Sequence, residues 1–301
     1  MTRMGLKSQK PEISASTVHP VRGSLLRGAG SARALATCLL ILVAGCVPDG
    51  LEDFDFQGLQ PPPPPDELTG DALVGTASGG GLDVELYAAR GGAHLGYVRL
   101  GLRVARSGEA VRDARIVISA TPEAGPASGV ALPVENPATA ADADGFFRGA
   151  AFLLTPDTTA RDFTIRASVE TLDGASGEVT FAVEARNDLW MQKDGDLLVS
   201  WIDPLRPVVG NNLFTVAALR WTGSAFVPAD GLGADLYPYM DMGGGDGHST
   251  PHSAPEALGD GRYSWDVDFI MSGGWEMTVT LTPPGESDAT ARFVGYTVYD
   301  Q

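Results

Sequence analysis

The stretch Phe163-Thr164-Ile165-Arg166-Ala167-Ser168-Val169-Glu170 has an apolar residue at every second position. Successive side chains of a β-strand point to opposite faces, so this alternation predicts a strand with one buried face. The same period of two recurs in four further segments, at residues 84–87, 98–104, 114–119 and 178–184. Because no segment has a long apolar stripe at helical spacing, we expect an all-β chain.

Turn signals separate these alternating segments. Asp-Gly pairs occupy residues 144–145, 194–195 and 260–261, and this dipeptide is typical of tight turns between antiparallel strands. Many short strands with Gly, Pro and Asp between them favour antiparallel β-sandwiches of the immunoglobulin-like kind.

The second half of the chain repeats the first at offsets of 112 to 118 positions. The matching positions are Gly96 with Gly210, Pro133 with Pro251, Asp144-Gly145 with Asp260-Gly261, Phe152 with Phe269, and Phe163 with Trp275. The repeat predicts two tandem sandwich domains at residues 71–187 and 188–301, the first being the degenerate copy. A single larger sandwich is the alternative.

Residues 1–45 are predicted to be a secretory signal peptide. Basic residues precede the apolar run Leu39-Leu40-Ile41-Leu42-Val43, which is the order of such signals. From Ala34 to Ala44 the apolar region has 11 residues, whereas a membrane span needs about 20. We therefore expect an exported chain whose signal is removed.

Cys46 follows Ala44-Gly45, and this order resembles the bacterial lipoprotein signal. The resemblance implies that Cys46 becomes the mature N-terminus and is modified covalently with lipid, including palmitate. Val47-Pro48, with no Asp directly after the cysteine, resembles the signal that directs a lipoprotein across the periplasm to the outer membrane in bacteria with two membranes. The expected place is therefore the cell envelope, anchored in the outer membrane. An ordinary signal peptide with a chance cysteine is the alternative.

Residues 46–70 are predicted to be the lipidated cysteine and an acidic, proline-rich linker. The five prolines Pro61 to Pro65 impose an extended helix of ~15 Å, at about 3.1 Å per residue. A stiff spacer behind a lipid holds a folded body away from the membrane. The run is alternatively a ligand for the groove of a partner protein.

The charge of the chain argues against nucleic acid as a partner. Residues 1–45 hold six of the 21 basic and one of the 38 acidic residues, so the remainder has 15 basic and 37 acidic residues and a net charge of −22. Nucleic-acid binding needs a basic face that releases counterions. The remaining partners are the membrane, through the N-terminal lipid, and an envelope protein.

The segment from Gly259 to Val279 resembles the YtkA-like family, which is related to the FixH proteins. Members are small extracytoplasmic β-sandwich modules with a Met- and His-rich loop ahead of this segment, as residues 237–252 have here. The resemblance covers most of residues 196–283 and, more weakly, residues 82–170. It implies copper handling, or the assembly of copper-containing membrane machinery.

The candidate metal ligands are Met240, Met242, His248 and His252. On an extended strand the two methionines share one face, with Tyr237 and Tyr239 on the other face. A glycine-rich loop at residues 243–247 would fold His248 back over the strand, and Asp241 or Asp246 would accept a hydrogen bond from an imidazole N–H. Thioether sulfur selects Cu(I) and imidazole suits both copper states, so copper is the predicted cofactor.

A comparison of the two repeats leaves a second interpretation open. The first domain has Pro122, Ala124, Val130 and Val134 opposite the four candidate ligands, so it lacks all of them. Either the second domain alone holds the metal, or its methionines are core residues and its histidines merely occupy a loop.

No signature of an enzyme is present. The sequence has no Gly-x-Ser-x-Gly elbow, His-Glu-x-x-His or phosphate loop, so we expect a protein that is not an enzyme. His94 is expected to be an ordinary surface histidine. Trp190 and Trp201 are expected to be buried like most large aromatics, with an exposed sugar-stacking platform as the alternative.

Two hypotheses about function follow. In the first, a lipid-anchored extracytoplasmic protein binds copper through the Met/His loop of its second domain, for delivery or sequestration. In the second, a non-enzymatic structural or interaction lipoprotein of the cell envelope uses the same tethered sandwiches and binds no metal. Whether Met240, Met242, His248 and His252 converge distinguishes the two.

Overall fold

The computed structural model describes residues 71–186, 190–243 and 246–300. The predicted signal peptide, Cys46, the linker and the predicted domain boundary at residues 187 and 188 lie outside these ranges. All described residues belong to one compact unit, residues 54–301. Within the described part of the chain, no helix is long and apolar enough to cross a membrane.

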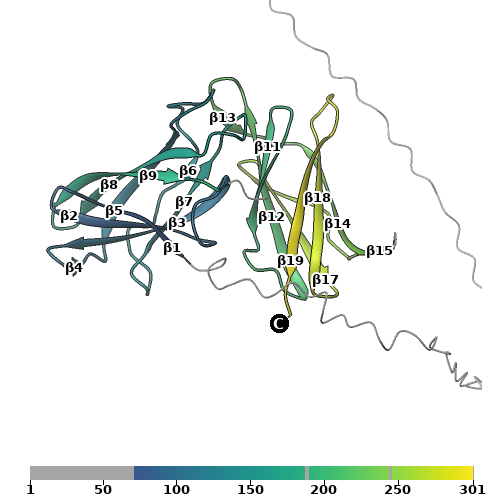
Figure 1. Cartoon of the computed structure of the whole chain (residues 1–301), viewed down its shortest axis with the longest axis horizontal. Helices are drawn as coiled ribbons and strands as arrows, with labels where there is room; N and C mark the ends of the chain where they lie inside the picture. Colours follow the sequence, from purple (N-terminus) through teal and green to yellow (C-terminus); the bar gives the residue numbers. More distant parts are fainter. Residues whose placement is uncertain (1–70, 187–189, 244–245, 301) are drawn as a thin grey trace, which may run out of the picture. The chain divides into compact units, whose positions relative to one another are not determined.

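The first sandwich comprises strands β1 to β9 (Figure 1). Its strands are β1 (Ala72–Gly79), β2 (Leu82–Ala88), β3 (Gly96–Arg106), β4 (Glu109–Ala110), β5 (Ala114–Pro122), β6 (Val134–Glu135), β7 (Phe147–Leu153), β8 (Asp162–Thr171) and β9 (Ser176–Glu184). One sheet has the order β1-β2-β3-β7-β6, with β4 paired to β3, and the other has the order β5-β8-β9. The order β2-β3-β7-β6 opposite β5-β8-β9 matches the ABED and CFG sheets of an immunoglobulin-like sandwich.

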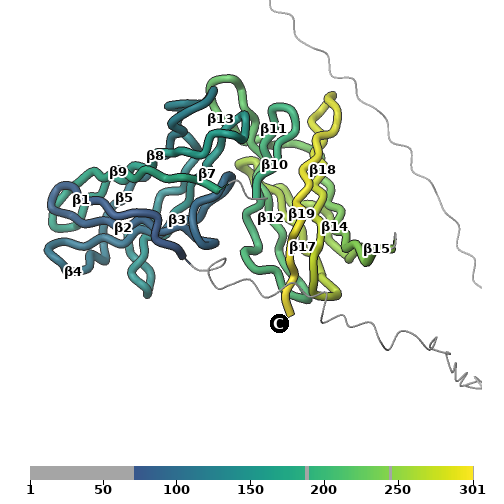
Figure 2. The backbone as a smooth tube through the Cα atoms, viewed as in Figure 1, coloured from purple at the N-terminus to yellow at the C-terminus, as the bar shows by residue number. Residues whose placement is uncertain are grey.

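The second sandwich comprises strands β10 to β19. Its strands are β10 (Met191–Asp194), β11 (Leu197–Asp203), β12 (Gly210–Trp221), β13 (Phe226–Pro228), β14 (Gly233–Gly243), β15 (Asp246–Ser249), β16 (Glu256–Gly259), β17 (Arg262–Phe269), β18 (Gly273–Thr282) and β19 (Ala289–Val298). The sheets have the orders β10-β11-β12-β17-β16, with β13 paired to β12, and β15-β14-β18-β19. Figure 2 follows β14, β18 and β19 side by side in the second of these sheets. The predicted fold class, two immunoglobulin-like antiparallel sandwiches, is confirmed.

The alternating pattern produces the core as predicted. In β8 the side chains of Phe163, Ile165, Ala167 and Val169 are buried between the sheets, and the residues between them face outward. Each large apolar side chain that is fully buried contributes about 1.5–3 kcal/mol. In the second sandwich the equivalent strand β18 buries residues 275, 277, 279 and 281 in the same way.

The hydrogen-bond register corrects one match between the repeats. Leu153 pairs with the glycine that begins β3, and Phe269 pairs with the glycine that begins β12. Leu153, not Phe152, is therefore the equivalent of Phe269. A slip of one residue moves a side chain to the opposite face of its strand, so sequence similarity between aromatics was misleading at this position.

Strand β11 departs from the alternating pattern because both of its faces are covered. Residues 197–202 are buried without interruption. Leu197 and Val199 belong to the core of the second sandwich, whereas Leu198 and Ile202 pack in the core of the first. A strand buried on both faces has a continuous apolar run. The first sandwich therefore contacts the outer face of β11.

Candidate functional site

The two candidate thioether ligands lie on β14. Their side chains share one face of the strand, as predicted, and Tyr237 and Tyr239 lie on the other face with their rings stacked at 6.0 Å between centroids. The face that the methionines share is the core face. Met240 is only 5% exposed and belongs to the same core as Trp275, and Met242 is half-buried and packs against that core.

The two candidate imidazole ligands lie in different places. His248 of β15 is directly opposite Met240 of β14, but its own side chain is exposed. His252 forms an isolated bridge with Val267 of β17, which belongs to the opposite sheet. The structure thus brings Met240 and His248 together on paired strands and places His252 on the other sheet.

The two carboxylates that were predicted to accept a hydrogen bond from an imidazole N–H are also placed differently. An Asp241 carboxylate oxygen accepts a hydrogen bond from the backbone N–H of Gly243 at 2.8 Å, so it binds the backbone at the end of β14. Asp246 begins β15 and is exposed. Among the described residues, no three His, Cys, Asp or Glu side chains cluster closely enough to hold a metal ion. A copper site here would depend on the two methionine thioethers, and the side chain of Met240 is buried in the core.

The outer surface of the same sheet has a different character. We call the side chains of Tyr237, Tyr239, Asp241, Glu276 and Arg292 the tyrosine face. A hollow of about 440 Å³ lies on it, lined by residues 239, 241, 274–276, 292, 294 and 295. Small-ligand sites in proteins occupy about 300–1,000 Å³, so the hollow has the size of a binding site.

An ion pair forms one wall of this hollow. Arg292 of β19 donates hydrogen bonds through Nε and Nη2 to the two carboxylate oxygens of Glu276 on β18. The hydrogen bond from Arg292 is the main reason why the pKa of Glu276 lies below its ordinary value. A planar guanidinium and a planar carboxylate in this paired arrangement present donors and acceptors at fixed angles.

Glycines give the hollow its depth and hold one tyrosine in place. A side chain at Gly274 would meet nothing within 4 Å, so the glycine leaves open space beside Glu276. A Cβ atom at Gly247 of β15 would collide with the ring of Tyr239. The Tyr239 ring therefore lies against the backbone of β15, which restricts its rotation.

The first sandwich lacks this surface at the equivalent positions. Tyr239 pairs with Glu276 across β14 and β18. Because Phe163 corresponds to Trp275, the equivalent pair across β5 and β8 is Thr121 with Thr164. The two sandwiches keep the same register and differ in the side chains that it displays.

A second group of polar and aromatic side chains is buried where β11 meets the first sandwich. The guanidinium carbon of Arg90 lies 3.7 Å from the ring centroid of Trp190 and 5.1 Å from that of Trp201. Arg90 also donates a hydrogen bond to the carbonyl oxygen of Ile202 at 3.0 Å. The alternative of an exposed sugar platform is wrong, because the two indoles pack on each other at 4.0 Å and on an arginine.

The prediction of a surface histidine at position 94 is also wrong. His94 is 1% exposed and lies 5.8 Å from the ring of Trp190. Burial, assisted by the charge of Arg90, lowers the pKa of His94 from 6.5 to about 3. His94 lies just before β3, where the first sandwich contacts Trp190. The sequence around His94 gives no sign of this contact between the two domains.

Polar contacts also join the two sandwiches. The hydroxyl of Ser200 on β11 accepts a hydrogen bond from the backbone N–H of Tyr97 at 2.7 Å. Arg99 forms an ion pair with Asp203 at 2.7 Å, and Arg262 forms one with Glu135. These contacts join β3 and β6 of the first sandwich to β11 and β17 of the second.

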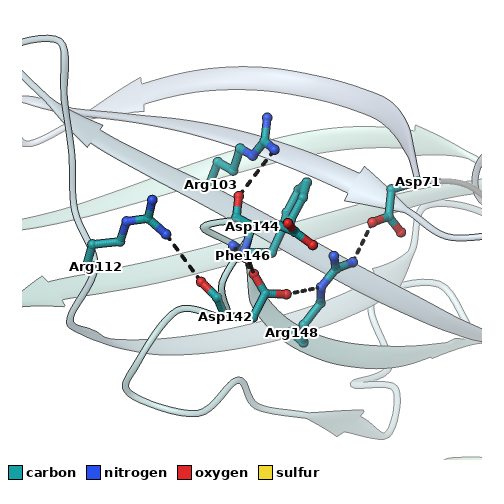
Figure 3. A network of polar contacts seen from close by, with 7 residues as sticks. All are labelled: Asp71, Arg103, Arg112, Asp142, Asp144, Phe146 and Arg148. Carbon is teal, nitrogen blue, oxygen red and sulfur yellow. Dashed lines mark hydrogen bonds and ion pairs between the residues drawn. The ribbon is translucent and has the colours of Figure 1, made fainter.

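An arginine cluster covers Phe146 on the outer face of the first sandwich (Figure 3). The guanidinium carbons of Arg103 and Arg148 lie 4.1 and 4.2 Å from the Phe146 ring centroid. Arg148 donates hydrogen bonds to Asp142 at 2.8 Å and to Asp71 at 2.5 Å, and the first of these is the main cause of the lowered pKa of Asp142. The cluster therefore ties Asp71, which follows the linker, to the sheet.

Comparisons with known proteins assign no family to the chain. No family model matches the chain, and no curated protein matches it. Among solved structures, the chain is similar to invasin, a bacterial integrin-binding protein, at 14% sequence identity and a TM-score of 0.22. The match covers 70% of this chain and 39% of the invasin chain, so this chain spans less than half the length of that protein. A similarity this distant carries no argument about function.

Proposed function

We propose that the chain is a non-enzymatic interaction lipoprotein, in which two joined sandwiches are displayed on a lipid tether outside the cytoplasm. The observation that supports this choice over copper binding is the burial of Met240 in the core to which Trp275 also belongs. Moving a core methionine to bind a metal would leave a cavity, and truncating such a side chain costs about 2–5 kcal/mol.

The contact between the sandwiches supports an interaction role. Strand β11 is buried on both faces, and three polar contacts join β11 and β17 to the first sandwich. A pair of domains joined in this way keeps its binding surfaces in a constant arrangement, which reduces the entropy lost when a partner binds. The acidic composition disfavours nucleic acid, so an envelope protein or another envelope component remains the expected partner.

Display at the membrane depends on Cys46, and labelling tests it. A bacterial host that expresses the full chain is grown with a palmitate analogue that carries a clickable group. We expect label in the wild-type chain and none in Cys46→Ser, with the wild-type chain in the outer-membrane fraction. Unlabelled wild-type chain in the soluble exported fraction would contradict the lipid anchor.

Copper handling, which the YtkA-like resemblance implies, is the second candidate. The position of His248 directly opposite Met240 favours it, since both belong to the predicted ligand set. It requires the Met240 thioether to leave the core and reach the exposed imidazole of His248 on the neighbouring strand. Metal titration separates the two candidates.

A further inference from the structure

The tyrosine face has the features of a small-ligand site that the proposed function does not yet use. Its hollow of about 440 Å³ lies on a four-stranded sheet, β15-β14-β18-β19, and all its lining residues come from β14, β18 and β19. Sites placed on regular strands keep their geometry better than sites on loops.

The charges of the hollow indicate what kind of ligand it accepts. Arg292 is neutralised by Glu276, and Asp241 adds a further negative charge. The whole chain has a net charge of −17. An anionic ligand would meet no uncompensated cation here, so a phosphate or a carboxylate is disfavoured. This charge balance leaves neutral and cationic ligands, and the polar groups of the hollow favour the neutral class.

The polar groups of the hollow match a ligand with many hydroxyl groups. Asp241 and Glu276 offer acceptors, and the Arg292 side chain, which is 64% exposed, has N–H groups beyond the two that bind Glu276. A hydroxyl group donates one hydrogen bond and accepts two, so it satisfies carboxylate and guanidinium neighbours together. A planar carboxylate and a planar guanidinium can each bind two adjacent hydroxyl groups of a sugar ring and so orient the ring.

The aromatic groups match the other property of such a ligand, its apolar C–H face. Tyr237 is 54% exposed, and the planes of Tyr237 and Tyr239 are inclined by only 15°. The Tyr239 ring is restrained by Gly247, so little conformational freedom is lost when a ligand packs on it. An aromatic ring with a polar hydroxyl suits a ligand that is apolar on one side and polar at its edge.

We propose that the tyrosine face binds a neutral oligosaccharide, with Tyr237 and Tyr239 packing on sugar rings and Asp241, Glu276 and Arg292 binding their hydroxyl groups. This inference rests on the proposed function, a non-enzymatic interaction lipoprotein that binds an envelope component. The first sandwich, which has Thr121 and Thr164 at the equivalent pair, is not expected to share the activity.

The test uses the full chain in a detergent without sugar groups, since a glycoside headgroup would compete. Calorimetric titration with cellotetraose, maltotetraose, mannotetraose and tetra-N-acetylchitotetraose measures binding, with tetragalacturonate as the anionic comparison. We expect at least one neutral tetrasaccharide to bind and tetragalacturonate to bind at least about tenfold more weakly. Glu276→Gln and Tyr237→Ala, both at partly or largely exposed positions, should each lower the affinity at least about tenfold.

The matched control is Thr121→Ala/Thr164→Ala in the first sandwich, which should leave the affinity unchanged. No binding of any neutral tetrasaccharide, or binding that Glu276→Gln and Tyr237→Ala both leave unchanged, would overturn the proposal. If no neutral tetrasaccharide binds, the tyrosine face would instead contact a protein partner, and the proposed interaction function would still stand. Only tight copper binding would remove the interaction function itself, so the two failures are distinguishable.

Discussion

The guanidinium group of Arg90 lies on the ring of Trp190, 3.7 Å from its centroid, at the place where the first sandwich meets β11. Arg90 is 2% exposed and donates a hydrogen bond to the backbone of β11 at Ile202. A charged group this deeply buried is costly unless its surroundings stabilise it, so the indole face and the carbonyl are necessary parts of the contact.

Arg90→Met tests how much this contact contributes to stability. The variant keeps the apolar stem and loses the cation–π contact and the donor to Ile202, so we expect a loss of about 2–3 kcal/mol of unfolding free energy. Urea unfolding of the full chain measures it. Arg103→Met is the matched control, because Arg103 also covers an aromatic ring, at 4.1 Å from Phe146, but is exposed. An equal loss in both variants would contradict the account.

His94 makes stability depend on pH. In the folded chain its pKa is about 3 rather than 6.5, and it lies near the charges of Arg90 and Arg186. Between these two pH values the unfolded chain binds a proton that the folded chain does not. The full contribution is therefore present above pH ~6.5, and stability falls with decreasing pH by up to about 1.4 kcal/mol per unit.

Substitution isolates the effect of this histidine. We expect His94→Gln to flatten the unfolding free energy between about pH 6.5 and 4.5, a range above the ordinary pKa of most carboxyl groups. Exposed His252 supplies the control, and His252→Gln should keep the slope of the wild-type chain. A slope that persists in His94→Gln would mean that another group titrates there.

Two buried tyrosines should respond in opposite ways to loss of their hydroxyl groups. The Tyr263 hydroxyl donates to the carbonyl oxygen of Ala229 at 2.8 Å and accepts from the backbone N–H of Leu232 at 3.1 Å. The Tyr296 hydroxyl is buried and has no hydrogen-bond partner among the described residues. Burial raises the pKa of Tyr296 well above its ordinary value.

We therefore expect Tyr263→Phe to cost about 1–3 kcal/mol, because it leaves a buried N–H and a carbonyl without a partner. Tyr296→Phe should be neutral, or stabilise by about 1 kcal/mol, since it removes a polar group that is buried without compensation. Thermal unfolding compares the two single variants. Equal destabilisation by both would show that the Tyr296 hydroxyl is satisfied in solution.

The fold was predictable because it depends on local signals. Alternation in segments such as Phe163 to Glu170 defines the strands and their buried faces, and Asp-Gly pairs define their turns. The similarity of the two halves predicted two sandwiches. The match of Phe152 to Phe269 was off by one residue because strand register depends on hydrogen bonds between distant segments, which sequence similarity does not report.

The candidate site was less predictable because it depends on contacts between strands. The sequence placed Met240 and Met242 on one face of a strand, but not which face the opposite sheet would cover. Tyr237 and Tyr239 were visible as a pair, whereas the Glu276–Arg292 wall appears only when β18 and β19 are in register. The burial of His94 likewise depends on a second domain that lies far along the chain.

The central claim is that the body binds a partner rather than copper, and a competitive Cu(I) titration tests it most directly. The full chain competes with a chromophoric Cu(I) chelator, beside His248→Ala/His252→Ala and the nearly isosteric Met240→Leu. The account predicts weak binding that is the same in all three proteins, since Met240 lies in the core. Tight one-to-one binding that both variants lose would contradict it and identify a copper-handling lipoprotein.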